Sequence, residues 1–267
     1  MKQNYLRTPI KQSLRQVFAI SSVTFQELLR EKILWSALLF AVLCVALSLA
    51  AAQLSFADQA RIALDFGLTS VSIIGGLISV IMGSSLIAKE VHHRTLYLVL
   101  TKAVWRWQFV VGKFLGLLAL LTLNSLIISG IAIGIFLLLD GQFRMSILQN
   151  YILQMSEFAI LSAVACVFSA FSTATLSAIV TSGIWIIGHA MTDFQVLIPK
   201  IEPPLARPFL DFTARVLPDL TRFDIKAQVS HILPVTWSYT GVSVLYALSY
   251  VLFALAIACF VFTRRDL

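Results

Sequence analysis

Glu157 is the side chain that most invites a chemical interpretation, because it is a carboxylate inside a long apolar stretch. From Met145 to Thr192, only Glu157 and His189 interrupt apolar or neutral residues. A charge at membrane depth is costly and usually faces a cavity or a partner. Glu157 could therefore line a path for an ion or a proton, as in a secondary transporter or channel. It could equally pair with a neighbouring helix, or snorkel to the outer surface about two turns away.

Ser182 and His189 are the residue types of an intramembrane serine protease, which would make the chain an integral membrane enzyme. The pattern is incomplete, because Val180 and Thr181 stand where that motif begins with glycine. Ser182 and His189 also share one short apolar stretch. Small residues that let helices pack closely explain this sequence better. We therefore predict no catalytic residue.

Neither a metal site nor a nucleotide site can be assembled from the sequence. The histidines and cysteines lack metal-ligand spacing; they stand at His92, His93, His189, His231, Cys44, Cys166 and Cys259. A phosphate-binding loop would read Gly-x-x-x-x-Gly-Lys-Ser/Thr, whereas Gly112-Lys113 is followed by Phe114. The chain is thus predicted to bind no metal or cofactor and to hydrolyse no ATP by itself.

The elements that position these residues are apolar segments long enough to cross a membrane. Hydrophobic residues make up 59% of the 267-residue chain and charged residues 12%, against roughly 25% charged in soluble domains. About 20 apolar residues cross the hydrocarbon core. We predict an all-α, polytopic membrane protein with six transmembrane helices, at 33–54, 66–87, 114–139, 151–171, 176–191 and 239–262. The fourth and fifth are separated at 172–175, because the apolar run is too long for one span.

The distribution of charge orients this bundle. With both ends inside, 13 Lys and Arg lie on the inner side and 7 on the outer side, as the positive-inside rule requires. On the inner side, within residues 1–32, helical spacing predicts an amphipathic helix over Leu14–Leu29 in the membrane interface. On the outer side, residues 193–237 form the longest polar region, with a second amphipathic helix over Leu205–Val216. The net charge of +7 is divided among short loops and ends, so it does not indicate nucleic acid.

The segment from Ala88 to Lys113 is the most distinctive polar part of the chain. It lies between the second and third spans and carries five Lys or Arg against one carboxylate. Glu90 and Arg94 are one helical turn apart and can form an ion pair, and Thr95 can cap the helix that follows. A short basic segment on the inner side could dock a partner, or it could only set the topology.

The stretch 89–113 resembles the signature of the ABC exporter permeases of the second type. It reads Lys-Glu-x-x-x-Arg-Thr-Leu-x-x-x-Leu-Thr-Lys-x-x-x-Arg-x-x-Phe-x-x-Gly-Lys. Residues 25–35 resemble the entry of that family into its first span. The tail also matches, with Leu-Pro-Asp-Leu-x-x-Phe at 217–223 and a final Phe-Thr-Arg-Arg-Asp-Leu. In length and ending, the chain looks most similar to the copper-site maturation and gliding-motility permeases.

The resemblance implies a membrane subunit with six spans, a second permease subunit (identical or different), and two copies of a separate ABC ATPase subunit that bind ATP and Mg²⁺. It also implies that 88–113 contains a cytoplasmic coupling helix that docks in a groove of the ATPase. Carried over by position, the docking residues are Glu90, Arg94, Thr95, Lys102 and Arg106. Residues 1–267 then form one permease domain among the lipids of a bacterial inner membrane, with both termini cytoplasmic.

Overall fold

The computed structural model describes residues 10–53, 59–92, 105–192, 216–231 and 233–264. Every regular element in these ranges is a helix, which confirms the all-α class for this part of the chain. The long helices are α1 (Ile10–Leu29), α2 (Lys32–Gln53), α3 (Gln59–Ser85), α6 (Arg106–Leu138), α7 (Met145–Phe171), α8 (Ala174–His189) and α12 (Trp237–Arg264). The short ones are α4 (Ala88–His92), the 3-10 helix η2 (Thr221–Phe223) and α11 (Lys226–Ser230).

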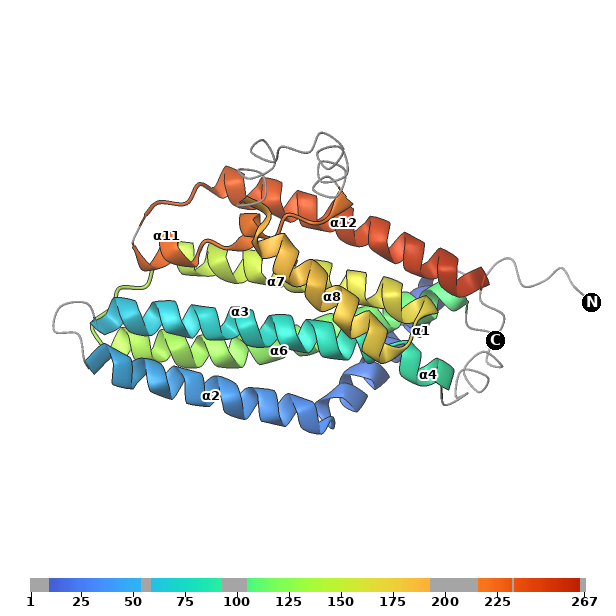
Figure 1. Ribbon diagram of the computed structural model, residues 1–267, viewed down its shortest axis with the longest axis horizontal. Helices are drawn as coiled ribbons and strands as arrows, with labels where there is room; N and C mark the ends of the chain where they lie inside the picture. Colours follow the sequence, from blue (N-terminus) through green and yellow to red (C-terminus); the bar gives the residue numbers. More distant parts are fainter. Residues whose placement is uncertain (1–9, 54–58, 93–104, 193–215, 232, 265–267) are drawn as a thin grey trace, which may run out of the picture.

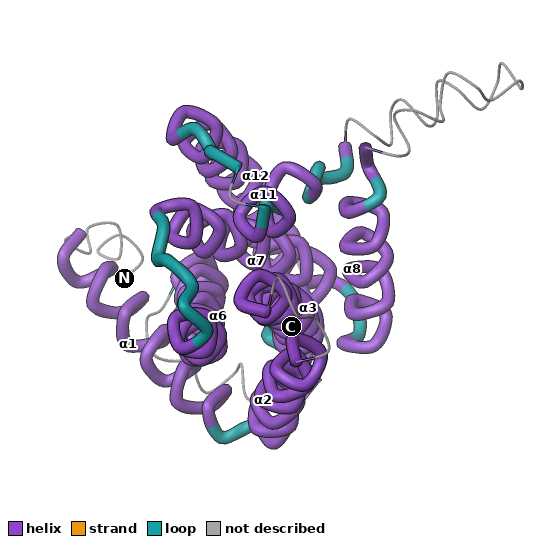
Figure 2. The backbone as a smooth tube through the Cα atoms, turned by 90° about the vertical axis from the view of Figure 1, so that its left-hand side faces the viewer, coloured by secondary structure: helices purple, strands orange, loops and turns teal. Residues whose placement is uncertain are grey.

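Helix α3 forms the centre of the bundle. Figure 2 looks along the helices and shows α3 among α2, α6, α7 and α8, with α1 outside α6 and α12 beyond α7. Glycines make this crowding possible. A Cβ atom on Gly75 would collide with the ring of Phe158, and one on Gly76 would collide with the ring of Trp185. Two aromatic rings, one from α7 and one from α8, thus rest directly on the backbone of α3.

Four helices of the described part are long and apolar enough to cross a membrane: α3, α6, α7 and α12. In the most apolar stretch of each helix, 78% of the residues are buried at α3 but only 28% at α12. The outward face of α12 therefore carries exposed apolar side chains, among them Leu245, Leu248, Leu252, Phe253 and Phe260. The chain is a multi-pass membrane protein. That it has six spans stays a prediction.

Helices nevertheless occupy all six of the ranges predicted to be spans. The predicted break between the fourth and fifth is confirmed, because α7 ends at Phe171 and α8 begins at Ala174. Thr173 caps α8, since its hydroxyl oxygen accepts a hydrogen bond from the backbone N–H of Leu176 at 3.4 Å. The predicted starts of the second, third and fourth helices were too late by six to eight residues, because each helix continues through a polar first part.

The start of α6 illustrates this difference. Residues 106–113 belong to the helix, not to a connecting segment. The backbone N–H of Trp105 donates to Oε1 of Gln108 at 2.9 Å, so the first turn is closed by a side chain from within the helix. Three cations of the 88–113 segment therefore lie on described helices, namely Lys89 on α4 and Arg106 and Lys113 on α6.

The predicted helix over Leu14–Leu29 is confirmed as part of α1, which crosses α6 at two glycines. A Cβ atom on Gly112 would lie 2.8 Å from Ile20, and one on Gly116 would lie 2.7 Å from the carbonyl oxygen of Ser21. Small residues four apart let two helices approach this closely. The opposite face of α1 leaves Phe18 76% exposed. That this face lies in the membrane interface stays a prediction.

The two ends of the bundle differ in what they hold. Helices α1 and α4 and the end of α12 lie at one end, and α11 lies at the other (Figure 1). We call these the terminal end and the far end. Most of the predicted amphipathic helix Leu205–Val216 lies outside the described residues.

Residues 216–231, part of the predicted outer polar region, pack into the bundle, and their outer location stays a prediction. Leu220 and Phe223 are fully buried. The backbone N–H of Leu220 donates to the carbonyl oxygen of Gly188 at 3.1 Å. Arg222 donates to Asp219 at 3.0 Å, and this hydrogen bond raises the pKa of the guanidinium. Buried apolar residues two to four positions apart, from Leu220 to Val229, anchor the segment. The many polar residues between them hid this pattern in the sequence.

Candidate functional site

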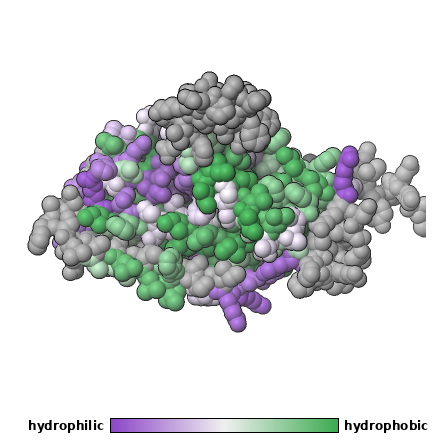
Figure 3. Space-filling model, viewed as in Figure 1, coloured by the Kyte–Doolittle hydropathy of each residue, from purple (hydrophilic) through white to green (hydrophobic). Residues whose placement is uncertain are grey.

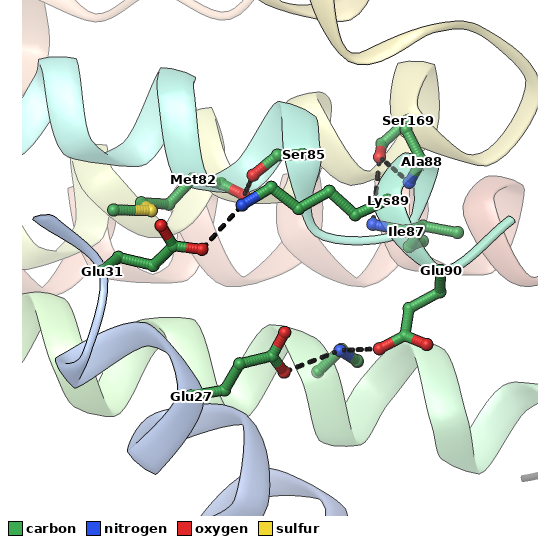
Figure 4. Close-up of polar contacts among 10 residues, drawn as sticks. Glu27, Glu31, Met82, Ser85, Ile87, Ala88, Lys89, Glu90 and Ser169 are labelled. Carbon is green, nitrogen blue, oxygen red and sulfur yellow. Dashed lines mark hydrogen bonds and ion pairs between the residues drawn. The ribbon is translucent and has the colours of Figure 1, made fainter. Parts of the chain in front are cut away.

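The candidate site lies at the terminal end, where α3 stops and α4 begins. Ser169 of α7 holds this break. Its hydroxyl accepts hydrogen bonds from the backbone N–H groups of Ile87 at 3.1 Å and Ala88 at 3.0 Å (Figure 4). It also donates to the carbonyl oxygen of Ser84 at 2.8 Å. One buried hydroxyl thus satisfies three backbone groups that the interrupted helix would otherwise leave without partners. Helix α7, through Ser169, therefore fixes the direction in which α4 leaves α3.

A buried lysine joins α4 to its neighbours. The ammonium group of Lys113 on α6 lies 2.7 Å from Glu90 on α4 and 3.3 Å from Glu27 on α1. Figure 4 shows the two carboxylates reaching the same nitrogen from different helices. The side chain of Lys113 is 7% exposed, whereas those of Glu90 and Glu27 are 18% and 49% exposed. An ammonium this deeply buried requires a charged partner, and here it has two.

Two further contacts tie the same end together. Lys89 of α4 pairs with Glu31, which follows α1, at 2.7 Å. Arg106, in the first turn of α6, donates to the carbonyl oxygens of Phe262 at 3.1 Å and Thr263 at 3.0 Å. These carbonyls end α12, where the helix dipole attracts a cation. We call Glu27, Glu31, Lys89, Glu90 and Lys113 the charge cluster.

The structure places two of the five predicted docking residues. Glu90 belongs to the charge cluster and faces α6, and Arg106 contacts the end of α12. Arg94, Thr95 and Lys102 lie outside the described residues, and so does the predicted helix that Thr95 would cap. A role for these five residues in docking an ATPase stays a prediction.

Sequence reasoning missed three members of the site, Lys113, Glu27 and Ser169. Lys113 was placed at the end of the basic segment and the entry to the third span, with no partner predicted. It contacts Glu27 in the fold, although the two stand 86 positions apart in the sequence. One signal was available. Gly112 and Gly116 bracket Lys113, and this small-x-x-x-small spacing indicates that a second helix crosses here.

Glu157, the other predicted site residue, is buried between helices. Its side chain is 1% exposed. Oε1 accepts a hydrogen bond from Nε1 of Trp185 at 3.3 Å and lies 3.5 Å from Nε2 of His189, both on α8. Glu157 does not snorkel, because α7 begins at Met145, twelve residues before it, which is about 18 Å at 1.5 Å per residue. The structure shows that Glu157 contacts a neighbouring helix. That it lines a translocation path stays a prediction.

A comparison with protein families gives one match that covers most of the chain. A model described as "ABC-2 family transporter protein" matches residues 18–267. The chain belongs to the ABC-2 transporter family. No curated protein matches this ABC-2 permease.

Family membership sets the general role of the ABC-2 permease. It is a membrane component for transport and not itself catalytic, and the family associates with an ABC ATPase subunit. Ser182 and His189 stand seven residues apart on α8, about 10 Å along the axis, and His189 faces Glu157 instead. No group of three or more His, Cys, Asp or Glu that could hold a metal occurs among the residues that the structure describes.

Proposed function

We propose that this ABC-2 permease couples ATP hydrolysis by a separate ATPase subunit to the movement of a substrate across a bacterial inner membrane. The observation that carries the proposal is the position of Lys113. It joins α1, α4 and α6 through two ion pairs at the terminal end, beside the end of α12. A force applied to α4 would therefore be passed to α1 and α6 together.

The docking surface of this proposal is the segment 88–113. Its two ends are anchored to the bundle, at Glu90 by Lys113 and at Arg106 by the end of α12. Between these anchors, Arg94, Thr95 and Lys102 are assigned to the contact with the ATPase. Charged contacts at such a surface fix the register and the choice of partner more than they add affinity.

The proposed topology has six spans and both termini in the cytoplasm. A second permease subunit, identical or different, completes the transporter, and two ATPase subunits bind ATP and Mg²⁺. The exposed apolar face of α12 supports this arrangement, because large apolar patches are rare on the surfaces of soluble monomers. In the transporter, lipid or the second subunit would cover this face.

The test separates docking from coupling. The chain is co-purified with a candidate ATPase and reconstituted, and both ATPase binding and stimulated ATP hydrolysis are measured. We expect Arg94→Glu combined with Lys102→Glu to reduce binding at least tenfold. We expect Lys113→Met to keep binding but to lose most of the stimulation. Arg15→Gln, on the exposed face of α1, is the control and changes neither.

The outcome that refutes the docking assignment is equally specific. If reversal of the charges at Glu90 and Arg94 leaves both binding and stimulation intact, the segment 88–113 is not the docking surface. A secondary transporter would instead show gradient-driven flux without any ATPase, and this flux would be lost in Glu157→Gln. The contacts of Glu157 with Trp185 and His189 support a structural role and thus the ATP-driven alternative.

A further inference from the structure

A cavity of about 600 Å³ opens at the far end of the bundle. It lies between the starts of α3 and α7, the end of α6 and the helix α11, and is closed on one side by the turn 139–144. Figure 3 shows hydrophilic side chains gathered at this end of the molecule, on the left of the view, next to the apolar middle. A volume of this size is typical of sites for small organic molecules.

The lining of the cavity is positively charged. It includes Arg61 of α3, Arg144 and His231, with Asp140 as the single carboxylate among its described lining residues. Neither arginine forms a salt bridge with a described residue; Arg61 instead contacts the imidazole of His231, with 2.7 Å between Nη2 and Nε2. The first turns of α3 and α7 contain no acidic residue, so the positive ends of two helix dipoles add to the field.

One wall of the same cavity is apolar. Leu64, Phe136, Leu139, Ile147 and Val229 contribute to it. Leu64, Ile147 and Val229 are buried, so this wall continues into the core of the bundle. A charged group and an apolar chain could therefore be accommodated side by side.

A buried amide lies on α7 one helical turn beyond the cavity lining. Asn150 is fully buried, and neither its Oδ1 nor its Nδ2 has a hydrogen-bond partner among the described residues. It follows Ser146, which lines the cavity, by one turn of α7, and Gln154 and Glu157 continue the same face inward. Unpaired amide atoms in the interior are rare and costly. Asn150 does not itself line the cavity, so its unpaired amide marks a polar position one turn further in, toward which a ligand in the cavity would point.

We propose that this cavity binds the anionic head group, a phosphate or a carboxylate, of an amphiphile whose chain lies along the apolar wall. Arg61 and Arg144 hold the anion, since guanidinium groups match both oxyanions with paired hydrogen bonds. The inference does not depend on the proposed coupling to an ATPase. The amphiphile has two possible sources, a phospholipid of the bilayer or a soluble molecule.

The binding test uses the purified full-length chain in a neutral detergent, with decyl phosphate as the probe. The dissociation constant is measured by native mass spectrometry and by the shift in melting temperature. We expect Arg61→Gln combined with Arg144→Gln to weaken binding at least tenfold. Arg15→Gln combined with Arg30→Gln, which removes the same charge from the terminal end, leaves it unchanged. Arg61→Lys combined with Arg144→Lys retains part of the affinity and shows that the cavity can still form.

The source is distinguished by reconstitution into nanodiscs of phosphatidylglycerol or of phosphatidylcholine. A bilayer source predicts that phosphatidylglycerol competes with decyl phosphate and raises its apparent dissociation constant, whereas a soluble source predicts equal values in both lipids. Three results overturn the proposal: no binding of decyl phosphate, equal affinity in the Arg61→Gln/Arg144→Gln variant, or equal affinity for decyltrimethylammonium.

Discussion

The terminal end and the far end of the bundle use their cations in opposite ways. At the terminal end, Lys89 and Lys113 meet carboxylates, and Arg106 meets the carbonyls that end α12. At the far end, Arg61 and Arg144 line a cavity and form no salt bridge with described residues. Charge therefore holds helices together at one end, whereas the two arginines at the other end have no carboxylate partner among the residues that the structure describes. The positive-inside rule, which counts charges, does not distinguish these uses.

The buried position of Lys113 explains how the terminal end fixes one arrangement of its helices. Ion pairs with buried members are weak contributors to net stability, because desolvation offsets most of the attraction. They instead raise the free energy of any packing that would separate the partners and leave a buried charge unpaired. In this protein the ion pairs thus fix the relative register of α1, α4 and α6.

The largest effect is expected from Lys113→Met. The substitution leaves Glu90, whose side chain is 18% exposed, beside Glu27 without the cation that both contact. We expect the free energy of unfolding to fall by about 3 kcal/mol, the low end for removing one member of a buried pair, because Glu27 is half exposed. Equilibrium unfolding in mixed micelles measures this change.

A double variant identifies the cause of that loss. Adding Glu90→Gln to Lys113→Met removes the buried charge left behind, so about half of the lost stability should return. If the double variant is less stable than Lys113→Met by the full effect of Glu90→Gln alone, the two residues do not interact, and the comparison between the ends loses its basis.

The second-largest effect is expected from Gly116→Ala, where α1 crosses α6. A Cβ atom on Gly116 would lie 2.7 Å from the carbonyl oxygen of Ser21 and equally close to Thr24, so the two backbones must separate. We expect Gly116→Ala to lower the free energy of unfolding by about 2 kcal/mol, as overpacking does. Limited proteolysis should also cleave α1 sooner.

Gly130→Ala is the matched control on the same helix. Nothing lies within 4 Å of the position of its Cβ atom. Alanine favours a helix over glycine by about 1 kcal/mol, so this variant should be as stable as the wild type or more so. Equal losses in Gly116→Ala and Gly130→Ala would show that α1 does not pack on α6 as described.

These residues also show how far the sequence could predict the fold and the site. Hydrophobic runs located the helices, and the length of one run predicted the break at 172–175 between α7 and α8, because both signals are local. The partners of Lys113 could not be predicted, since helical spacing gives the faces of a helix but not the helix that each face meets. The burial of Leu220 and Phe223 was missed for a related reason. Two apolar anchors in a polar, proline-rich segment leave its average composition polar.

A smaller effect is expected from Ser169→Ala at the break between α3 and α4. The substitution leaves the N–H groups of Ile87 and Ala88 without their hydrogen-bond acceptor. We expect a loss of about 1 to 2 kcal/mol and faster hydrogen exchange at these two amides. Ser156→Ala is the control, because Ser156 bonds only to its own helix at the carbonyl oxygen of Ile152. A normal exchange rate at Ile87 and Ala88 in Ser169→Ala would contradict the assigned role.

The smallest effects are expected when one arginine from each end is replaced by glutamine and the changes in stability are compared. Arg106→Gln removes two hydrogen bonds to the end of α12, so we expect a loss of about 1 kcal/mol in the free energy of unfolding. Arg61→Gln removes a cation without a described carboxylate partner, and we expect a change within about 0.5 kcal/mol. The pair is decisive because the substitutions are chemically identical. If Arg61→Gln were the more destabilising, the arginines of the far end would be structural, and the cavity would lose the feature that makes it a site for an anion.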